Sequence, residues 1–382
     1  MQSFLAIVTI FKNESHLLIE WLEHYLREGV DHFYMVDHGS TDSSLSLLRP
    51  YRDQHLVEVV RDPRPYDPQA IINQVYMTRV QQETQWVLVV ELDQFIYSRP
   101  PYATVAEYLR SLPPTVGQIC IPSKIFGSSG ALLGGIAPND SPSTKSTPST
   151  KPSLSPGASP TPQAVDLYVH RALYPPEAHA RSTIQSIVRT SSLAQLGWHR
   201  SQLTSTGSVV EITSDQLPLT GDQLELQAID ETRLSHSALH CNHYVLQAFE
   251  TFQRVKMSRD DLTTPWRNRL RNYNYYNLYD QYSNQQEDRE LQNKTTQLQV
   301  FYGCGCYREV THQALKLCWS PTTCVFHISP DLDFNHCFGD PAPRKEKHLA
   351  VRHGAQLIVY QEHRHGHEVA QTFPRPLVQL AS

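Results

Sequence analysis

Short apolar runs alternate with helical segments in the first part of the chain. Apolar residues follow one another almost without interruption at 4–10, 33–36, 57–60 and 86–90. Runs of this length that are rich in β-branched residues are typical of strands buried on both faces of a sheet. The intervening segments carry apolar residues at a helical spacing, at 17–26, 43–48 and 69–82. This order predicts a β-α-β-α-β-α-β unit with parallel strands and right-handed crossovers.

The pattern is less regular in the rest of the chain. A further strand is predicted at 118–122, and an amphipathic helix at 245–259 carries Arg254, Lys256 and Arg259. Residues 139–162 are almost wholly Ser, Thr, Pro and Lys. Such a segment cannot bury an apolar core, so we expect it to be disordered. Residues 267–282 are dense in Tyr and Asn, which suits a sugar-binding surface and packing between two domains equally well.

Composition describes a globular protein that does not bind nucleic acid. The chain has 382 residues, of which 40% are hydrophobic and 19% charged, and its net charge is −5. The N-terminal apolar run lacks a basic flank and a cleavage site, so it is not a signal peptide. No run approaches the roughly 18 apolar residues of a membrane helix. We therefore expect a soluble cytoplasmic protein, in the host cytoplasm if it is viral.

Seven cysteines are present, and five of them lie between residues 304 and 337. In the expected cytoplasmic setting they should be reduced. Their spacing does not match a paired Cys-x-x-Cys zinc pattern, so small buried thiols are the favoured interpretation.

Polar residues stand at the ends of three predicted strands. Asn13, Asp37 and the pair Glu91 and Asp93 all follow apolar runs. Ligands of parallel α/β sheets bind at these carboxyl ends. Two carboxylates one residue apart, leaving a regular strand on the same side, could approach one divalent cation that also grips a diphosphate. Two solvated acids would give the same triplet. The glycine fingerprint of a dinucleotide site is absent after the first strand, which argues against NAD.

These residues belong to a longer ordered set of motifs. The motifs occupy residues 11–14, 20–25, 29–34, 37–42, 91–95, 126–130, 187–189 with His199, and 242–244. In this order they resemble the family-2-like glycosyltransferases with the GT-A fold, nearest to the branch similar to family 92. The resemblance covers roughly residues 3–260. It implies an α/β, Rossmann-like mixed sheet with flanking helices.

The resemblance also implies roles for individual residues. Nucleotide-sugar binding falls to Thr9, Phe11, Asn13, Glu14, Asp37, Ser40 and Glu91. The implied metal ligands are Asp93, Glu91 and His243, which suit Mn²⁺ or Mg²⁺. Two positions depart from the family pattern, because relatives usually have Asp at position 91 and Glu at position 94, where this chain has Glu91 and Gln94.

The implied reaction moves a sugar from a nucleotide-diphosphate donor, expected to be a UDP-sugar, to a hydroxyl of a glycan, glycoprotein or lipid, with inversion. It needs a carboxylate base near the acceptor, and Asp166, Glu177 and Asp215 are candidates. The alternative is a weak or inactive transferase-like protein that binds carbohydrate or serves as a scaffold. A two-metal phosphoesterase is disfavoured because the clustered His and Asp ligands are missing.

Residues 299–362 are predicted to form a separate small β-rich module. It has short strand-and-turn pieces with Tyr-Gly, Val-Thr, Phe-Gly-Asp-Pro and Lys-x-Leu signatures. These resemble a module of viral and bacterial multidomain proteins. The expected organisation is a transferase domain at 1–282 with an insertion at about 138–163, a linker at 283–298, the module, and a tail at 363–382.

Overall fold

The computed structural model describes most of the chain. The described residues are 2–131, 163–173, 184–204, 210–214, 231–257, 271–296, 298–304, 306–320, 325–328, 333–339, 347–353, 356–361 and 369–372. The predicted disordered segment at 139–162 lies outside them. Among the described helices, none combines the length and the apolar character needed to cross a membrane.

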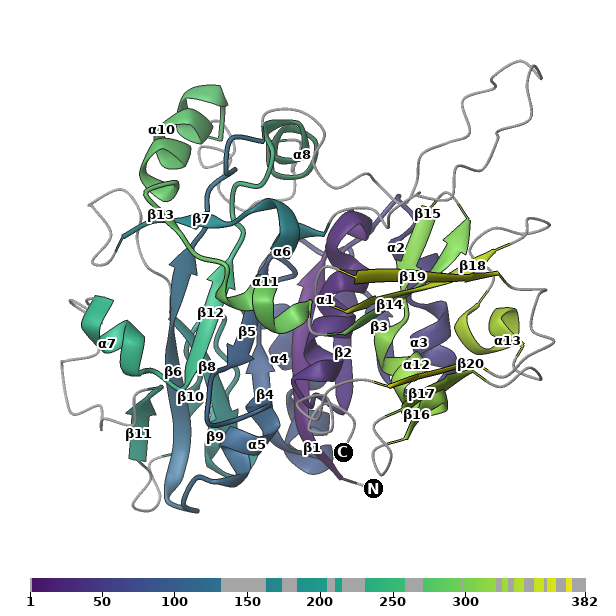
Figure 1. Cartoon of the computed structure of the whole chain (residues 1–382). Coiled ribbons are helices and arrows are strands. Elements are labelled where there is room, and N and C mark those ends of the chain that lie inside the picture. Colours follow the sequence, from purple (N-terminus) through teal and green to yellow (C-terminus); the bar gives the residue numbers. More distant parts are fainter. Residues whose placement is uncertain are drawn as a thin grey trace.

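A mixed sheet of nine described strands forms the centre of the molecule (Figure 1). The strands are β1 (Ser3–Phe11), β2 (His32–Asp37), β3 (Val57–Arg61), β4 (Thr84–Val89), β5 (Gln94–Ser98), β6 (Val116–Ile125), β8 (Ile184–Arg189), β11 (Val210–Thr213) and β12 (Leu239–His243). Their order is β3-β2-β1-β4-β8-β6-β12-β5, with β11 paired to β6. Strands β1 to β4 are mutually parallel, as predicted. Strand β8 is antiparallel to β4 and β6, and β5 is antiparallel to β12. The expected mixed α/β architecture is confirmed.

Helices cover both faces of the parallel part of the sheet. They are α1 (Ser15–Arg27), α2 (Ser44–Leu47), α3 (Arg49–Asp53), α4 (Pro68–Glu83) and α5 (Val105–Arg110). Side chains of β1 alternate between two cores, because successive residues of a strand point to opposite faces. Leu5 and Ile7 pack on the α1 side, and Ala6 and Val8 pack on the α4 side. This double burial explains the continuous apolar runs.

Shorter elements complete this part of the molecule. They are α6 (Ala164–Leu167), β7 (His170–Arg171), η1 (Thr190–Ser192), β9 (Leu193–Gln195), β10 (Gln202–Leu203), α7 (Glu231–His236), α8 (Phe249–Phe252), the π-helix η3 (Gln253–Met257), α10 (Tyr273–Ser283), β13 (Gln286–Glu287) and α11 (Glu290–Thr295). Where we predicted a continuous helix at 245–259, the chain forms α8 followed by η3. In Figure 1, α8 and α10 lie beyond the end of the sheet at which β1 finishes.

The C-terminal part has its own sheets and its own core. One sheet has the order β15-β14-β18-β19, and a smaller one has β16-β17-β20. The elements are β14 (Gln299–Cys304), β15 (Cys306–Glu309), α12 (Thr311–Cys318), β16 (Trp319–Ser320), β17 (Val325–Ile328), α13 (Phe334–Phe338), β18 (His348–His353), β19 (Gln356–Gln361) and β20 (Val369–Thr372). Helix α12 was not predicted, and it contacts α1 directly. The amphipathic α1 therefore has no solvent face, and all of its residues are buried.

Candidate metal and nucleotide site

The turn after β4 carries the two acids singled out in the sequence. We expected both side chains to leave a regular strand, but β4 ends at Val89 and residues 92–93 form a turn before β5. Helix α1 holds this turn through two side chains. Trp21 Nε1 donates to the Glu91 carbonyl at 3.0 Å, and the Tyr25 hydroxyl donates to the Gln94 carbonyl at 3.0 Å. Both donors belong to the motif at 20–25, so that motif positions the acids.

Strand pairing brings a histidine to the acids from far along the chain. Strand β12 runs antiparallel to β5, and this register places His243 opposite Gln94. The Tyr244 amide also donates to the Asp93 carbonyl at 2.8 Å. As a result, one ligand atom each of Glu91, Asp93 and His243 lies within 4.8 Å of the others. The three residues expected to bind metal therefore converge.

The donor set fits a divalent cation. Asp93 and His243 are buried, and within the described part of the chain Asp93 Oδ1 and His243 Nδ1 have no hydrogen-bond partner. Buried polar atoms are rarely left unpaired unless a ligand or ion completes them. Carboxylate oxygens with one imidazole nitrogen are suitable ligands for Mn²⁺. Asp93, His243 and the partly exposed Glu91 would hold the ion.

A lysine also reaches the same carboxylate. Lys256 Nζ lies 2.6 Å from Asp93 Oδ2, and His243 Nε2 lies 3.4 Å from Asp93 Oδ1. Burial alone would raise the pKa of Asp93, but the positive charges of Lys256 and His243 hold it well below its usual range. In the sequence, Lys256 is one of three basic residues on the predicted amphipathic helix at 245–259. Its contact with Asp93 depends on the path of η3 and has no local signal.

Gln94 and Glu91 are the two departures from the family pattern, and the Gln94 side chain folds back onto Glu91. The Glu91 amide donates to Gln94 Oε1 at 3.1 Å, and Gln94 Nε2 lies 3.5 Å from Glu91 Oε2. An amide at position 94 can therefore donate to the longer acid at position 91, which a second carboxylate could not do. The two departures are compatible with each other in the structure.

The ends of β1 and β2 bring together three of the residues expected to bind the nucleotide. Phe11 pairs with Asp37 in the sheet register, so Asn13 and Ser40 follow side by side. The Asn13 amide donates to Ser40 Oγ at 3.1 Å, and the Ser40 amide donates to Asp37 Oδ1 at 2.7 Å. Asn13 adopts φ 57°, the left-handed region that Asn tolerates better than most residues. Asp37 Oδ2 is buried 3.7 Å from Arg61 Nε.

A cavity of about 500 Å³ lies beside these turns. Its lining comes from two directions, because Asn13, Thr41 and Asp42 face Arg254 and Val255 of η3. Thr9 and Phe11, which were also expected to bind nucleotide, are fully buried in the sheet, and Glu14 is buried nearby in sequence. The side chains that line the cavity are therefore those after the strand rather than within it.

Polar contacts connect this region to the tyrosine-rich helix. The Tyr276 hydroxyl donates to the Gln247 carbonyl at 2.8 Å, and Gln247 Oε1 lies 3.1 Å from His16 Nε2. Burial and the charge of Arg254 lower the pKa of His16 to about 4, so this ring is neutral at physiological pH. Tyr276 is buried against Phe249 and Phe252, so packing accounts for its aromatic character. His16 and Gln247 belong to no recognisable sequence pattern, so neither was predicted to lie here.

The three candidate bases have different positions. Asp166 binds Arg352 through both carboxylate oxygens, at 3.0 and 3.3 Å. Glu177 and Asp215 lie outside the described residues. The choice among them stays a prediction.

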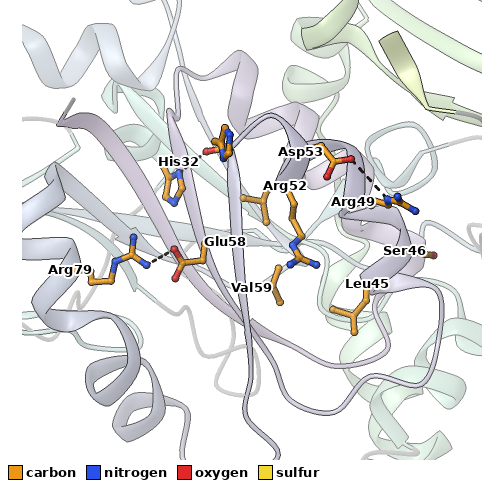
Figure 2. A pocket seen from close by; sticks show the side chains of 11 residues that line it. His32, Leu45, Ser46, Arg49, Arg52, Asp53, Glu58, Val59 and Arg79 are labelled. Atoms are coloured by element: carbon orange, nitrogen blue, oxygen red, sulfur yellow. Dashed lines mark hydrogen bonds and ion pairs between the residues drawn. The ribbon is translucent and has the colours of Figure 1, made fainter. Parts of the chain in front are cut away.

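A second hollow, of about 790 Å³, lies at the β3 edge of the sheet. Figure 2 shows Arg49 beside Asp53 and Arg79 beside Glu58, each joined as an ion pair. The arginines that face this hollow thus already have carboxylate partners in these two pairs. None of the residues expected to bind metal or nucleotide contributes to its lining.

Comparison with known proteins gives a family match for the first third of the chain. Residues 5–127 match the family model "Glycosyltransferase family 92". A glycosyltransferase family 92 protein of Oryza sativa subsp. japonica is 25% identical over 129 residues, which are 33% of this chain and 22% of the relative. The chain thus matches less than a quarter of the length of that curated relative.

Solved structures with local likeness are also transferases. A mannosyltransferase of Pyrobaculum calidifontis, solved with GDP-Man and Mn²⁺, has 22% identity and a TM-score of 0.26, with 32% of this chain and 36% of that chain covered. S. aureus TarS 1-349, solved with UDP-GlcNAc, has 16% identity and a TM-score of 0.28, with 49% and 46% covered. These scores are too low to support an argument about function. The family resemblance itself is confirmed, because residues 5–127, which include Asn13, Asp37, Glu91 and Asp93, match glycosyltransferase family 92.

Proposed function

We propose that the protein is a metal-dependent glycosyltransferase that moves a sugar from a nucleotide diphosphate to an acceptor hydroxyl. One observation carries the proposal. Glu91, Asp93 and His243 converge after the parallel strand β4. The segment η3 joins them to the cavity at the turns after β1 and β2, because its Arg254 lines that cavity and its Lys256 contacts Asp93. Ligands of open α/β sheets bind at the carboxyl ends of the strands. Two of the three residues, Glu91 and Asp93, lie in the stretch 5–127 that matches a glycosyltransferase family.

Each group has a definite task in the proposed reaction. Asp37, Ser40 and Asn13 would bind the base and ribose, and Arg254 would face the diphosphate across the cavity. A divalent cation, Mn²⁺ or Mg²⁺, supplies Lewis-acid stabilisation of charge on the leaving diphosphate. The acceptor hydroxyl would attack the anomeric carbon as the diphosphate departs, giving inversion in one displacement. Asp166, Glu177 and Asp215 are the candidates for the base that takes the hydroxyl proton.

The donor nucleotide is the first point to test. We expect UDP to be the preferred nucleotide, and the acceptor to be a hydroxyl of a glycan, glycoprotein or lipid. Calorimetric titration of UDP and of GDP, each with and without Mn²⁺, measures the donor site directly. Binding should need the metal and should disappear in Asp93→Ala. The matched control is Asp53→Ala, which removes an exposed carboxylate from the second hollow.

The same titration separates the two functional classes. Metal-dependent UDP binding followed by slow release of free sugar from a UDP-sugar would establish the donor half of the reaction. Absence of nucleotide binding in wild type, with carbohydrate binding retained, would contradict the proposal and support a non-catalytic carbohydrate-binding protein.

A further inference from the structure

The ammonium group of Lys256 contacts the acid that is expected to hold the metal. Lys256 Nζ lies 2.6 Å from Asp93 Oδ2, and both side chains are buried. A carboxylate with one buried positive partner is already neutralised. A divalent cation on Asp93 would bring a second positive charge close to that ammonium, and charges of like sign repel strongly where water is excluded. The contact and metal binding therefore oppose each other.

Lys256 belongs to a short helical segment whose helix type differs from that of the helix before it. Residues Gln253–Met257 form the π-helix η3 directly after the four-residue helix α8. Single π-helical turns are rare and often lie at functional sites. Lys256 could leave Asp93 by a rearrangement within this one turn, without unwinding a long helix.

The same turn also faces the nucleotide side. Arg254, two residues before Lys256, lines the cavity with Asn13 and Thr41. Charges of both Arg254 and Lys256 contribute to the lowered pKa of His16, in the first turn of α1. An ammonium released from Asp93 would therefore remain close to a cavity whose expected occupant carries a diphosphate. Lysine is a common point-charge partner for phosphate oxygens.

We propose that Lys256 is a displaceable cation that couples metal binding to nucleotide binding. In the metal-free protein its ammonium neutralises Asp93. With metal and nucleotide diphosphate bound, Asp93 would hold the ion and the Lys256 ammonium would turn to the diphosphate. Metal and nucleotide consequently bind with positive cooperativity, each strengthening the other by the same factor. This inference rests on the proposed donor site, and it assigns that site an internal regulator.

The test is a Mn²⁺ titration followed by electron paramagnetic resonance, which reports free Mn²⁺ without any turnover. Lys256→Met should bind Mn²⁺ alone about tenfold more tightly than wild type, within the range typical of coupled sites. With Mn²⁺ present, the same variant should bind UDP about tenfold more weakly. The coupling between the two ligands should shrink accordingly. Lys256→Gln, which keeps a hydrogen-bond donor but no charge, should behave like Lys256→Met and covers the case in which the methionine variant does not fold.

Arg254→Met is the matched control. It removes a neighbouring positive charge of η3 that faces the cavity, so it should weaken UDP binding and leave the affinity for Mn²⁺ alone nearly unchanged.

The outcomes also separate this inference from the proposed function. Unchanged or weaker Mn²⁺ affinity in both Lys256 variants, with wild type binding Mn²⁺ and UDP, would overturn the role of Lys256 alone. Failure of wild type and of both variants to bind Mn²⁺ or UDP would overturn the donor site together with it. Tight Mn²⁺ binding by the variants where wild type binds weakly would support the displaceable cation directly.

Discussion

Two groups of buried carboxylates are associated with helix α1. One lies in the turn after β4, which α1 holds, and the other belongs to α1 itself. They differ in how completely the carboxylate oxygens are hydrogen-bonded. Near the turn after β4, Asp93 Oδ1 has no hydrogen-bond partner within the described residues. At the contact with the C-terminal part, both oxygens of Glu20 accept backbone amides, from Ala164 and Val165, at 2.8 and 3.0 Å. Both oxygens of Glu23 also accept, from the Tyr51 hydroxyl and the His312 amide, each at 2.7 Å.

The helical repeat separates the two groups. Trp21 and Tyr25, four residues apart, lie on one face of α1 and hold the turn after β4. Glu20, Glu23 and Arg27, at spacings of three and four, lie on another face. There Arg27 forms a buried ion pair with Glu309 of β15. One helix thus joins the candidate site to the C-terminal part through two separate faces.

The difference indicates how to interpret a buried acid. Burial is costly for any carboxylate, and hydrogen bonds from the protein itself offset part of that cost. Both oxygens of Glu20 and of Glu23 accept such bonds, although burial still raises the pKa of both groups. The Glu20 and Glu23 group is complete in this sense and has a structural role. The Asp93 group leaves Asp93 Oδ1 and His243 Nδ1 without a hydrogen bond within the described residues, which favours an external ligand. Unpaired atoms on residues that also converge with a third possible ligand, more than burial alone, distinguish the candidate site.

The largest effect on the free energy of unfolding should come from breaking the buried ion pair between Arg27 and Glu309, beside Glu20 and Glu23. Arg27→Met removes the cation from a pair in which both side chains are buried, leaving the Glu309 charge without it. Breaking a buried pair in this way costs about 3–5 kcal/mol. We expect urea-induced unfolding to show a loss of this size, while Mn²⁺ affinity of the folded protein stays at the wild-type value. A large fall in Mn²⁺ affinity would show that the two faces of α1 are not independent.

The converse substitution is His243→Ala at the incomplete group. It removes one of the three ligands, so the rate of transfer should fall about 100-fold or more, since the metal supplies several kcal/mol of transition-state stabilisation. Stability should fall only moderately, because the imidazole loses its 3.4 Å contact with Asp93 through Nε2, while its Nδ1 has no hydrogen-bond partner to lose among the described residues. Parallel measurement of Mn²⁺ affinity and urea unfolding checks both parts. Strong destabilisation with intact Mn²⁺ binding would assign His243 to the fold instead.

The pH dependence of the free energy of unfolding should reveal the titration of Glu20 and Glu23. Burial, with added repulsion from Asp166 and Glu309, raises the pKa of Glu20 to about 8, and burial raises that of Glu23 to about 7, from an ordinary 4.5. A carboxyl with a raised pKa keeps its proton in the folded state after the unfolded chain has lost it. The free energy of unfolding therefore falls as pH rises from 4.5 to about 8.

Buried histidines act in the opposite direction at lower pH. Burial lowers the pKa of His16, His240 and His312 to about 4, so these rings favour unfolding only below their ordinary 6.5. The clean window is therefore pH 6.5–8, where we expect about a tenfold fall in the folding equilibrium constant. Urea unfolding across this window should show the slope in wild type and a reduced slope in Glu20→Gln. An unchanged slope in Glu20→Gln would assign the titration to another group.

Local sequence was sufficient to predict the parallel half of the central sheet, strands β1 to β4. Four apolar runs predicted β1 to β4, since burial on both faces requires nearly every residue to be apolar. The positions of Asn13, Asp37 and Asp93 followed, because each lies at the carboxyl end of one of those strands or within four residues of it. These features depend on residues close together in the chain, where hydrophobic periodicity is informative.

Long-range contacts explain what the pattern missed. His243 reaches Asp93 only through antiparallel pairing of β12 with β5, about which a short apolar stretch carries no information. Burial of Glu20, Glu23 and Arg27 on α1 also has no local signal, because charged residues at helical spacing are ordinarily exposed. Their partners include Ala164, Val165, Glu309 and His312, far along the chain. Lys256 likewise meets Asp93 across 163 positions.

The smallest effect should come from restoring the family pattern at position 94. Gln94 Nε2 is within 3.5 Å of Glu91 Oε2, and the side chain is buried. Gln94→Glu would place a second carboxylate there, adding negative charge near the ion and removing the donor that faces Glu91. Added ligand charge strengthens binding of a hard cation, so Mn²⁺ affinity should rise roughly threefold, with a slight loss of stability.

Gln94→Leu, which removes the donor without adding charge, is the matched control for Mn²⁺ titration and should not strengthen binding. Equal Mn²⁺ affinities in Gln94→Glu and Gln94→Leu would mean that position 94 acts by holding Glu91 and not through charge, and the incomplete group would then consist of Glu91, Asp93 and His243 alone.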